Sequence, residues 1–153
     1  MLFRSKNGMQ VEKYEKFPKI IDKVDNLIKD CKKNINDDVS LSILLMNECN
    51  FRIGHEKYKK LYGTNGTLTI GSNHMTKKDS GIEIEFSGKK KEVNYCLVKK
   101  KSSLYPILDK IVNKPRTPLF GDIKYDDVYD FLKKYKLRPK DIRQASANRS
   151  FYE

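Results

Sequence analysis

The sequence lacks the features of a membrane or secreted protein. Its longest apolar run, Ile43–Met46, falls far short of the roughly 20 residues that a membrane-spanning helix needs. The start of the chain, Met1–Lys6, contains no apolar core of a signal peptide. Cysteine is scarce, because Cys31, Cys49 and Cys96 are the only three and none has Cys-x-x-Cys spacing. We therefore expect a soluble intracellular protein with free thiols, no disulfide framework and no cysteine zinc site.

Cofactor motifs are also missing. No Gly-x-x-x-x-Gly-Lys-Ser/Thr segment is present, so nothing in the sequence argues for a nucleoside triphosphate. The two histidines, His55 and His74, have no cysteine, histidine or carboxylate at metal-ligand spacing. The sequence therefore predicts neither a bound metal nor another cofactor.

Acidic residues are in short supply. The chain has 32 Lys and Arg against 20 Asp and Glu, which gives a formal net charge of +12 and a pI near 9.5. The excess begins near Phe51, because 12 basic and 5 acidic residues lie between positions 51 and 101. This balance favours a polyanionic partner, although basicity alone does not choose between DNA, RNA and an acidic membrane. With 153 residues, 38% of them hydrophobic, the chain has enough core for one domain or two small lobes.

Helices are predicted where apolar residues recur at intervals of three and four. The clearest case runs from Phe17 to Cys31, with a regular apolar face from Ile20 onward. Asn36–Asp38 supplies N-cap residues for a second helix over about 39–49, so the two should pack as a hairpin. Further helices are predicted over about 104–114, over 128–135 and from Pro139 onward.

Between residues 64 and 100 the pattern changes to the two-residue period of β-strands. Ile82–Phe86 alternates apolar and polar side chains, and residues 67–70 and 93–98 are rich in β-prone types. These segments predict three antiparallel strands, the last two forming a hairpin with its tip at Gly88–Lys91. The fold class predicted is therefore α+β and mostly helical, with helices around a small three-stranded antiparallel sheet.

Three basic residues stand out, each with a simpler alternative. Arg52 lies next to Gly54, a glycine that lets another backbone or a phosphate approach closely, but Arg52 could equally be a solvated arginine at a helix end. Lys89 lies at the hairpin tip, where it can enter a DNA groove and donate a proton, or merely keep a turn soluble. Arg143 lies in the first turn of the last helix, where it can hold a phosphate or be solvated beside Asp141.

The order of these segments resembles the catalytic domain of type IB DNA topoisomerases, in the compact form found in poxviruses, other large DNA viruses and bacteria. The matching segments are Phe51–Gly54, Tyr58, Gly66–Ile70 with His74, Ile84–Lys89 and Lys140–Arg143. Together they extend the resemblance from about Ile43 to Asn148. Tyrosine recombinases share the plan of arginine, hairpin lysine and arginine, but the Arg-Ile-Gly and Phe-Ser-Gly-Lys segments look more like the topoisomerase.

The resemblance implies a mechanism without metal or ATP. In that family a tyrosine attacks a backbone phosphodiester to give a 3′-phosphotyrosyl bond, the cut strand rotates, and the 5′-hydroxyl reseals it. Arg52 and Arg143 would hold the non-bridging phosphate oxygens, and Lys89 would protonate the departing 5′-oxygen. The resemblance implies duplex DNA as partner, a monomer on DNA away from any membrane, and a location with DNA in a virion or an infected host cell. The residues expected at the DNA are His55, Tyr58, His74, Lys90 and Lys91.

The resemblance also has gaps. The family has a later histidine and then the nucleophilic tyrosine, whereas Tyr152 lies too close to Arg143 to match that tyrosine. We therefore expect an N-terminal segment over 1–15 and a partial, incomplete catalytic domain over 16–153, inactive on its own. Two alternatives stay open: a non-catalytic DNA-binding remnant that kept the phosphate-gripping residues, and a fragment of a tyrosine recombinase.

Overall fold

The computed structural model describes residues 20–63, 65–113, 119–121 and 123–152, with the backbone alone for Glu56, Tyr58 and 147–152. The predicted N-terminal segment over 1–15 lies outside these residues. None of the described helices is long and apolar enough to cross a bilayer.

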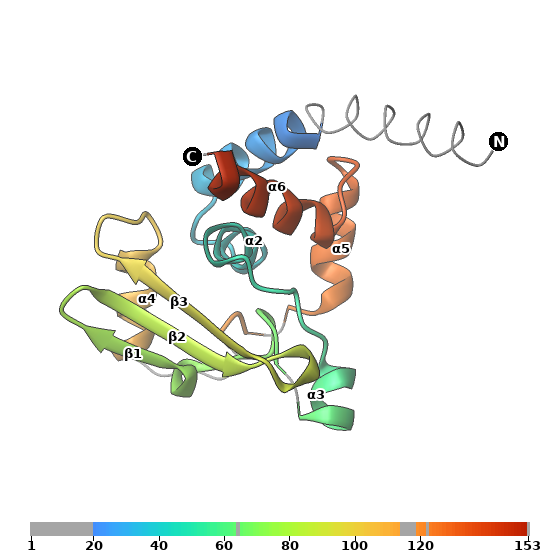
Figure 1. Ribbon diagram of the computed structural model, residues 1–153. Coiled ribbons are helices and arrows are strands. Elements are labelled where there is room, and N and C mark those ends of the chain that lie inside the picture. The colour runs from blue at the N-terminus through green and yellow to red at the C-terminus, as the bar shows by residue number, and fades with distance from the viewer. Residues whose placement is uncertain (1–19, 64, 114–118, 122, 153) are drawn as a thin grey trace.

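The chain forms a group of helices and a three-stranded antiparallel sheet, with α2 between them (Figure 1). On one side α2 packs against α5 and α6, and on the other against β3, while α4 packs against β1 and β2. This arrangement confirms the predicted α+β class. After a first helix over residues 20–33, the helices and strands are α2 Asp38–Cys49, α3 Glu56–Tyr62, β1 Met75–Lys78, β2 Gly81–Ser87, β3 Val93–Lys99, α4 Tyr105–Asn113, α5 Tyr125–Lys133 and α6 Pro139–Tyr152.

The long helices form where the apolar spacing predicts them. Asp37 caps α2, because its side chain accepts a hydrogen bond of 3.1 Å from the Ser40 backbone N–H; such a cap stabilises a helix by about 1 kcal/mol. Pro139 occupies the first turn of α6, where a missing N–H costs nothing. Short α3 is not predicted by any pattern, since it has seven residues and its apolar Leu61 is 61% exposed.

The first strand is not where the sequence predicts it. β1 occupies Met75–Lys78, whereas residues 67–70 form a buried turn. Backbone N–H groups in that turn bond to the carbonyls of Arg52 and Ile53 at 2.8 Å, and two more bond back to Gly66. Threonine and isoleucine favour strands because they pack well on half-buried surfaces, and this turn offers them the same burial.

The other two strands and their hairpin confirm the prediction. β2 and β3 pair antiparallel, with Ile84 opposite Cys96 and Ser87 opposite Val93. At the tip, a single 3₁₀ turn, η2 (Lys89–Lys91), reverses the chain. The hairpin therefore carries its lysines at the end of the sheet that points towards α3 (Figure 1).

The expectation of three free thiols is wrong for two of them. Cys49 and Cys96 form a disulfide that joins the end of α2 to β3, with Cα atoms 5.5 Å apart and a sequence separation of 47. The number and the spacing of the cysteines do not predict this disulfide, because the two residues become neighbours only when α2 packs on β3. Cys31 is free and buried, and burial raises the pKa of its thiol to about 11.

Candidate active site

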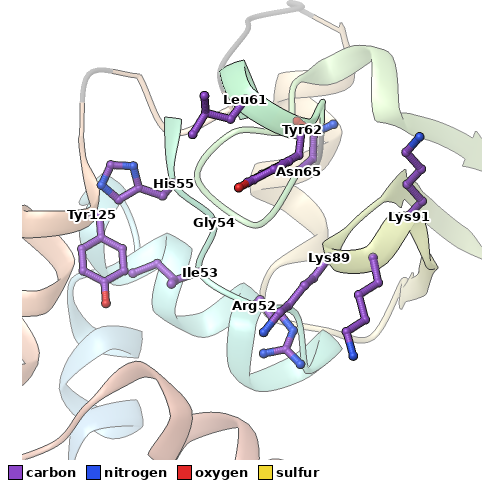
Figure 2. Close-up of a pocket in the computed structure, with 11 residues that line it drawn as sticks. Arg52, Ile53, Gly54, His55, Leu61, Tyr62, Asn65, Lys89, Lys91 and Tyr125 are labelled. Carbon is purple, nitrogen blue, oxygen red and sulfur yellow. The ribbon is translucent and has the colours of Figure 1, made fainter. Parts of the chain in front are cut away.

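A pocket of about 750 Å³ opens where the segment after α2, the loop after α3, the hairpin tip and the start of α5 meet (Figure 2). It is lined by the arginine and the lysine that the sequence singles out, Arg52 and Lys89. The other lining residues are Ile53, Gly54, His55, Leu61, Tyr62, Asn65, Lys90, Lys91 and Tyr125.

The backbone of Arg52 is held from one side by Thr67. The Arg52 carbonyl accepts hydrogen bonds of 2.8 Å from both the backbone N–H and the hydroxyl of Thr67. Gly54, at φ +80°, lies against Gly66 so closely that a Cβ at Gly54 would fall 2.7 Å from the Gly66 Cα. The glycine beside Arg52 therefore serves the approach of another backbone, one of the two uses that the sequence allows. With its main chain fixed, the exposed guanidinium is directed into the pocket (Figure 2).

The hairpin tip that carries Lys89 is also held by backbone hydrogen bonds. The Gly88 N–H bonds to the Glu92 carbonyl at 2.8 Å, and the Ser87 carbonyl accepts a bond of 2.9 Å from the Asn65 N–H. Asn65 lies two residues before Thr67, so the segment 65–70 connects the lysine hairpin to the arginine segment. In Figure 2 the Lys89 side chain is directed towards that of Arg52, whereas the Lys91 side chain is directed away from it.

Arg143, on α6, is not among the residues that line the pocket, but it lies near Arg52. Its Nε donates a hydrogen bond of 3.3 Å to the carbonyl of Asn50, the left-handed residue at φ 57° that ends α2. Burial and the neighbouring charge of Arg52 lower the pKa of Arg143. Among the residues whose side chains the structure describes, no carboxylate forms an ion pair with Arg52, Lys89 or Arg143. Like charges gathered without an acidic partner are the arrangement expected of an anion-binding site.

The histidines predicted at the DNA differ in position. His55 lines the pocket and caps α3, because its Nδ1 accepts a hydrogen bond of 3.0 Å from the Lys57 N–H. His74 is not among the residues that line the pocket; its Nδ1 accepts a 3.0 Å hydrogen bond from the Gly71 N–H, and its ring lies 6.3 Å from that of Phe86. Lys90 and Lys91 line the pocket, whereas the Tyr58 side chain lies outside the described residues.

The environment of His74 predicts a pH effect on stability. Burial lowers the pKa of His74 below its usual 6.5, so the unfolded chain takes up the proton first and stability falls as pH drops below about 6.5. His74→Asn keeps a hydrogen-bond acceptor without an imidazole that titrates. We expect a shallower loss of stability between pH 7 and 5 in this variant, measured by urea denaturation. Equal slopes in both proteins would contradict the prediction.

Several pocket residues carry no signal in the sequence. Tyr125 opens α5, more than 70 positions after Arg52, and its ring lies 5.3 Å from that of His55. Tyr62 and Leu61 line the pocket from the end of α3, which the sequence does not predict. Asn65 is the exception, since an Asn-Gly pair marks a turn, although its link to the hairpin is a tertiary contact.

Known proteins with similar sequences are DNA topoisomerases. The family described as the catalytic core of eukaryotic DNA topoisomerase I matches residues 4–148. The chain is 28% identical over 156 residues to DNA topoisomerase 1 of rabbit fibroma virus (strain Kasza), across 99% of this chain and 50% of the relative. It is 32% identical over 128 residues to DNA topoisomerase I of monkeypox virus and DNA topoisomerase 1B of vaccinia virus (strain Copenhagen), across 80% of this chain and 41% of each relative. The chain thus spans half or less of the length of these relatives.

Proposed function

This chain belongs to the type IB DNA topoisomerase family, and we propose that it holds the scissile phosphate of duplex DNA in such an enzyme. The observation that supports the proposal is that Arg52 and Lys89 line one pocket, while Arg143, from a third distant segment, lies close enough to Arg52 to feel its charge. The reaction proposed is relaxation of supercoiled DNA by transient cleavage of one strand and religation.

Each residue has a role that follows from its chemistry. The guanidiniums of Arg52 and Arg143 donate hydrogen bonds to the two non-bridging oxygens, whose negative charge grows in the transition state. A tyrosine oxygen attacks phosphorus and its phenolic proton passes to solvent, while the bond to the 5′-oxygen breaks and the ammonium of Lys89 gives its proton to that oxygen. In religation the 5′-hydroxyl attacks phosphorus, Lys89 takes the proton back, and the tyrosine oxygen leaves and takes up a proton from solvent.

The remaining parts of the proposal concern the DNA around this phosphate. Lys90, Lys91 and His55 line the same pocket and contact neighbouring backbone phosphates, and Tyr58 and His74 are proposed to assist from outside it. Such contacts position the duplex without reading its sequence. We propose further that the protein acts as a monomer on DNA, wherever that DNA lies in the virus or the cell.

Salt dependence tests the binding part of the proposal. Each lysine or arginine that meets a phosphate displaces condensed counterions, so log K should fall with log salt with a slope of about −0.9 per contact. We expect Arg52→Ala to make this slope shallower by about one contact, for unrelated duplexes alike. The measurement is fluorescence anisotropy with labelled duplexes between low and moderate salt.

The control for this experiment is Lys110→Ala, which removes one positive charge from α4 outside the pocket. Its salt slope should equal that of the unchanged protein. Equal slopes for Arg52→Ala and Lys110→Ala, or a flat response of the unchanged protein, would refute the phosphate site. If the protein binds duplex DNA normally, but replacing Arg52 or Lys89 does not change DNA cleavage, the non-catalytic DNA-binding alternative is favoured instead.

A further inference from the structure

The disulfide lies between the two segments that carry the site. Cys49 is the last residue of α2, and only Asn50 and Phe51 separate it from Arg52. Cys96 lies in β3, opposite Ile84 of β2, and these two strands form the hairpin that ends in Lys89. One covalent bond therefore ties the start of the arginine segment to the middle of the strand that leads from the lysine hairpin tip.

We propose that Cys49 and Cys96 form a redox switch: the disulfide holds Arg52 in position relative to Lys89, and its reduction loosens the phosphate site. The expected effect of the switch on DNA binding rests on the proposed function. The formation and reduction of the disulfide do not. It assigns to the two cysteines a regulatory role.

The chemistry requires a small disulfide, such as oxidised glutathione, as oxidant. The thiolate of one cysteine attacks a sulfur of the oxidant, and its bond to the other sulfur breaks, which releases one glutathione and leaves a mixed disulfide. The thiolate of the other cysteine then displaces the second glutathione and closes the Cys49–Cys96 bond. The protein loses two electrons and two thiol protons, and the oxidant becomes two thiols. Excess reduced glutathione reverses both steps.

The surroundings of the three cysteines make the reaction selective. Cys49 and Cys96 are partly exposed residues, and we expect a small thiol reagent to react with them for this reason. Cys31 is 0% exposed, and its raised pKa keeps it in the unreactive thiol form. The chain thus provides its own unreactive reference thiol.

Other contacts limit how far the site can loosen. Asn65 still bonds to the hairpin through the Ser87 carbonyl, and Thr67 still bonds to the Arg52 carbonyl. What reduction releases is the end of α2, including Asn50, whose carbonyl receives the Arg143 Nε. We therefore expect the reduced protein to bind phosphate more weakly but to stay folded.

The first experiment tests the switch without DNA. The full chain is equilibrated with glutathione buffers that range from oxidising to reducing. It is then treated with iodoacetamide under native conditions, and the number of labels is measured by mass spectrometry. We expect no labels in the oxidised protein and two labels in the reduced protein, at Cys49 and Cys96, with Cys31 unlabelled. If both cysteines remain labelled in oxidised glutathione, or if the bond resists reduced glutathione, the proposal fails.

The second experiment measures the consequence. Affinity for a short duplex should be about fivefold weaker in reduced than in oxidised protein, at the lower end of typical couplings between sites. Backbone hydrogen exchange should become faster at residues 50–54 on reduction. Cys31→Ser should respond like the unchanged protein, whereas Cys96→Ser should bind like the reduced form in both buffers.

The outcomes separate the two proposals. Duplex binding of equal strength in both redox states, with unchanged hydrogen exchange, would overturn the switch and leave the proposed function intact. If neither state binds DNA, the proposed function fails, and hydrogen exchange at residues 50–54 still decides whether the disulfide controls the arginine segment. Should Cys96→Ser not fold, reduced unchanged protein supplies the same comparison.

Discussion

Gly66→Ala is expected to lower the free energy of unfolding by about 3 kcal/mol, the upper part of the range for overpacking a close-packed region. A Cβ at Gly66 would fall 2.4 Å from the Gly54 Cα and 2.5 Å from the Gly54 nitrogen. Both contacts are with backbone, so no side chain can swing aside to make room. The turn can accept the methyl group only by moving away from the arginine segment, which breaks the bonds from Thr67 and Leu68 that hold it.

Chemical denaturation measures this effect, and Gly63→Ala is the matched control. Gly63 also has a positive φ, +66°, but a Cβ there meets nothing within 4 Å. Gly63→Ala should therefore lower the free energy of unfolding by about 1 kcal/mol, through backbone conformation alone. We expect Gly66→Ala to weaken duplex binding as well, because the Arg52 main chain loses its support, while Gly63→Ala leaves binding unchanged. A loss of stability no larger at Gly66 than at Gly63 would contradict the close approach of the two backbones.

The sequence predicts the regular elements well because each has a local cause. The apolar face of α4 includes Leu108 and Ile111, and both are buried as their spacing indicates. The β2–β3 hairpin is predicted from the alternation of Ile82–Phe86 and the glycine at the tip, which are local signals as well. In these segments propensity, periodicity and tertiary burial favour the same structure.

The errors arise where burial and covalent bonds depend on distant residues. Thr67–Ile70 has the composition of a strand, yet its N–H groups bond to the arginine segment instead of to a neighbouring strand. Cys49 and Cys96 lie 47 residues apart, and only the packing of α2 on β3 makes them partners. Local patterns carry no information about such contacts, so neither the turn nor the disulfide was predictable from periodicity or spacing.

In the candidate site, too, some residues are predicted from the sequence and others are not. Family resemblance predicts Arg52, Lys89 and Arg143, and their catalytic roles stay a prediction. The structure places Arg52 and Lys89 in one pocket and Arg143 within reach of the charge of Arg52, although the three come from a loop, a hairpin and a helix. The resemblance does not predict what holds them: the Asn50 carbonyl that accepts from Arg143 depends on how α2 ends against α6. Chemistry-bearing residues can be identified from sequence motifs, whereas the groups that position them become visible only in the fold.

Lys89→Ala is expected to slow DNA cleavage by about 10²- to 10⁴-fold, the contribution typical of a placed general acid or base. The assay uses a protein that carries this segment together with the family's nucleophilic tyrosine. Duplex affinity should stay nearly unchanged, because Lys90 and Lys91 on the same turn supply nonspecific attraction. Neither of them replaces a proton donor in the position of Lys89, whose side chain is directed towards Arg52 (Figure 2).

A modified substrate separates proton donation from other effects of Lys89. When sulfur replaces the 5′-oxygen at the scissile phosphate, the leaving group departs as a stable thiolate and needs no proton. The cleavage rate of Lys89→Ala should then approach that of the unchanged protein, whereas Arg52→Ala should stay slow because charge on the non-bridging oxygens is still unsupported. Lys91→Ala, the control on the same turn, should cleave both substrates at a normal rate. Equally slow cleavage of the sulfur substrate by Lys89→Ala would show that the lysine acts by positioning or charge, because a missing proton donor cannot matter where no proton is needed.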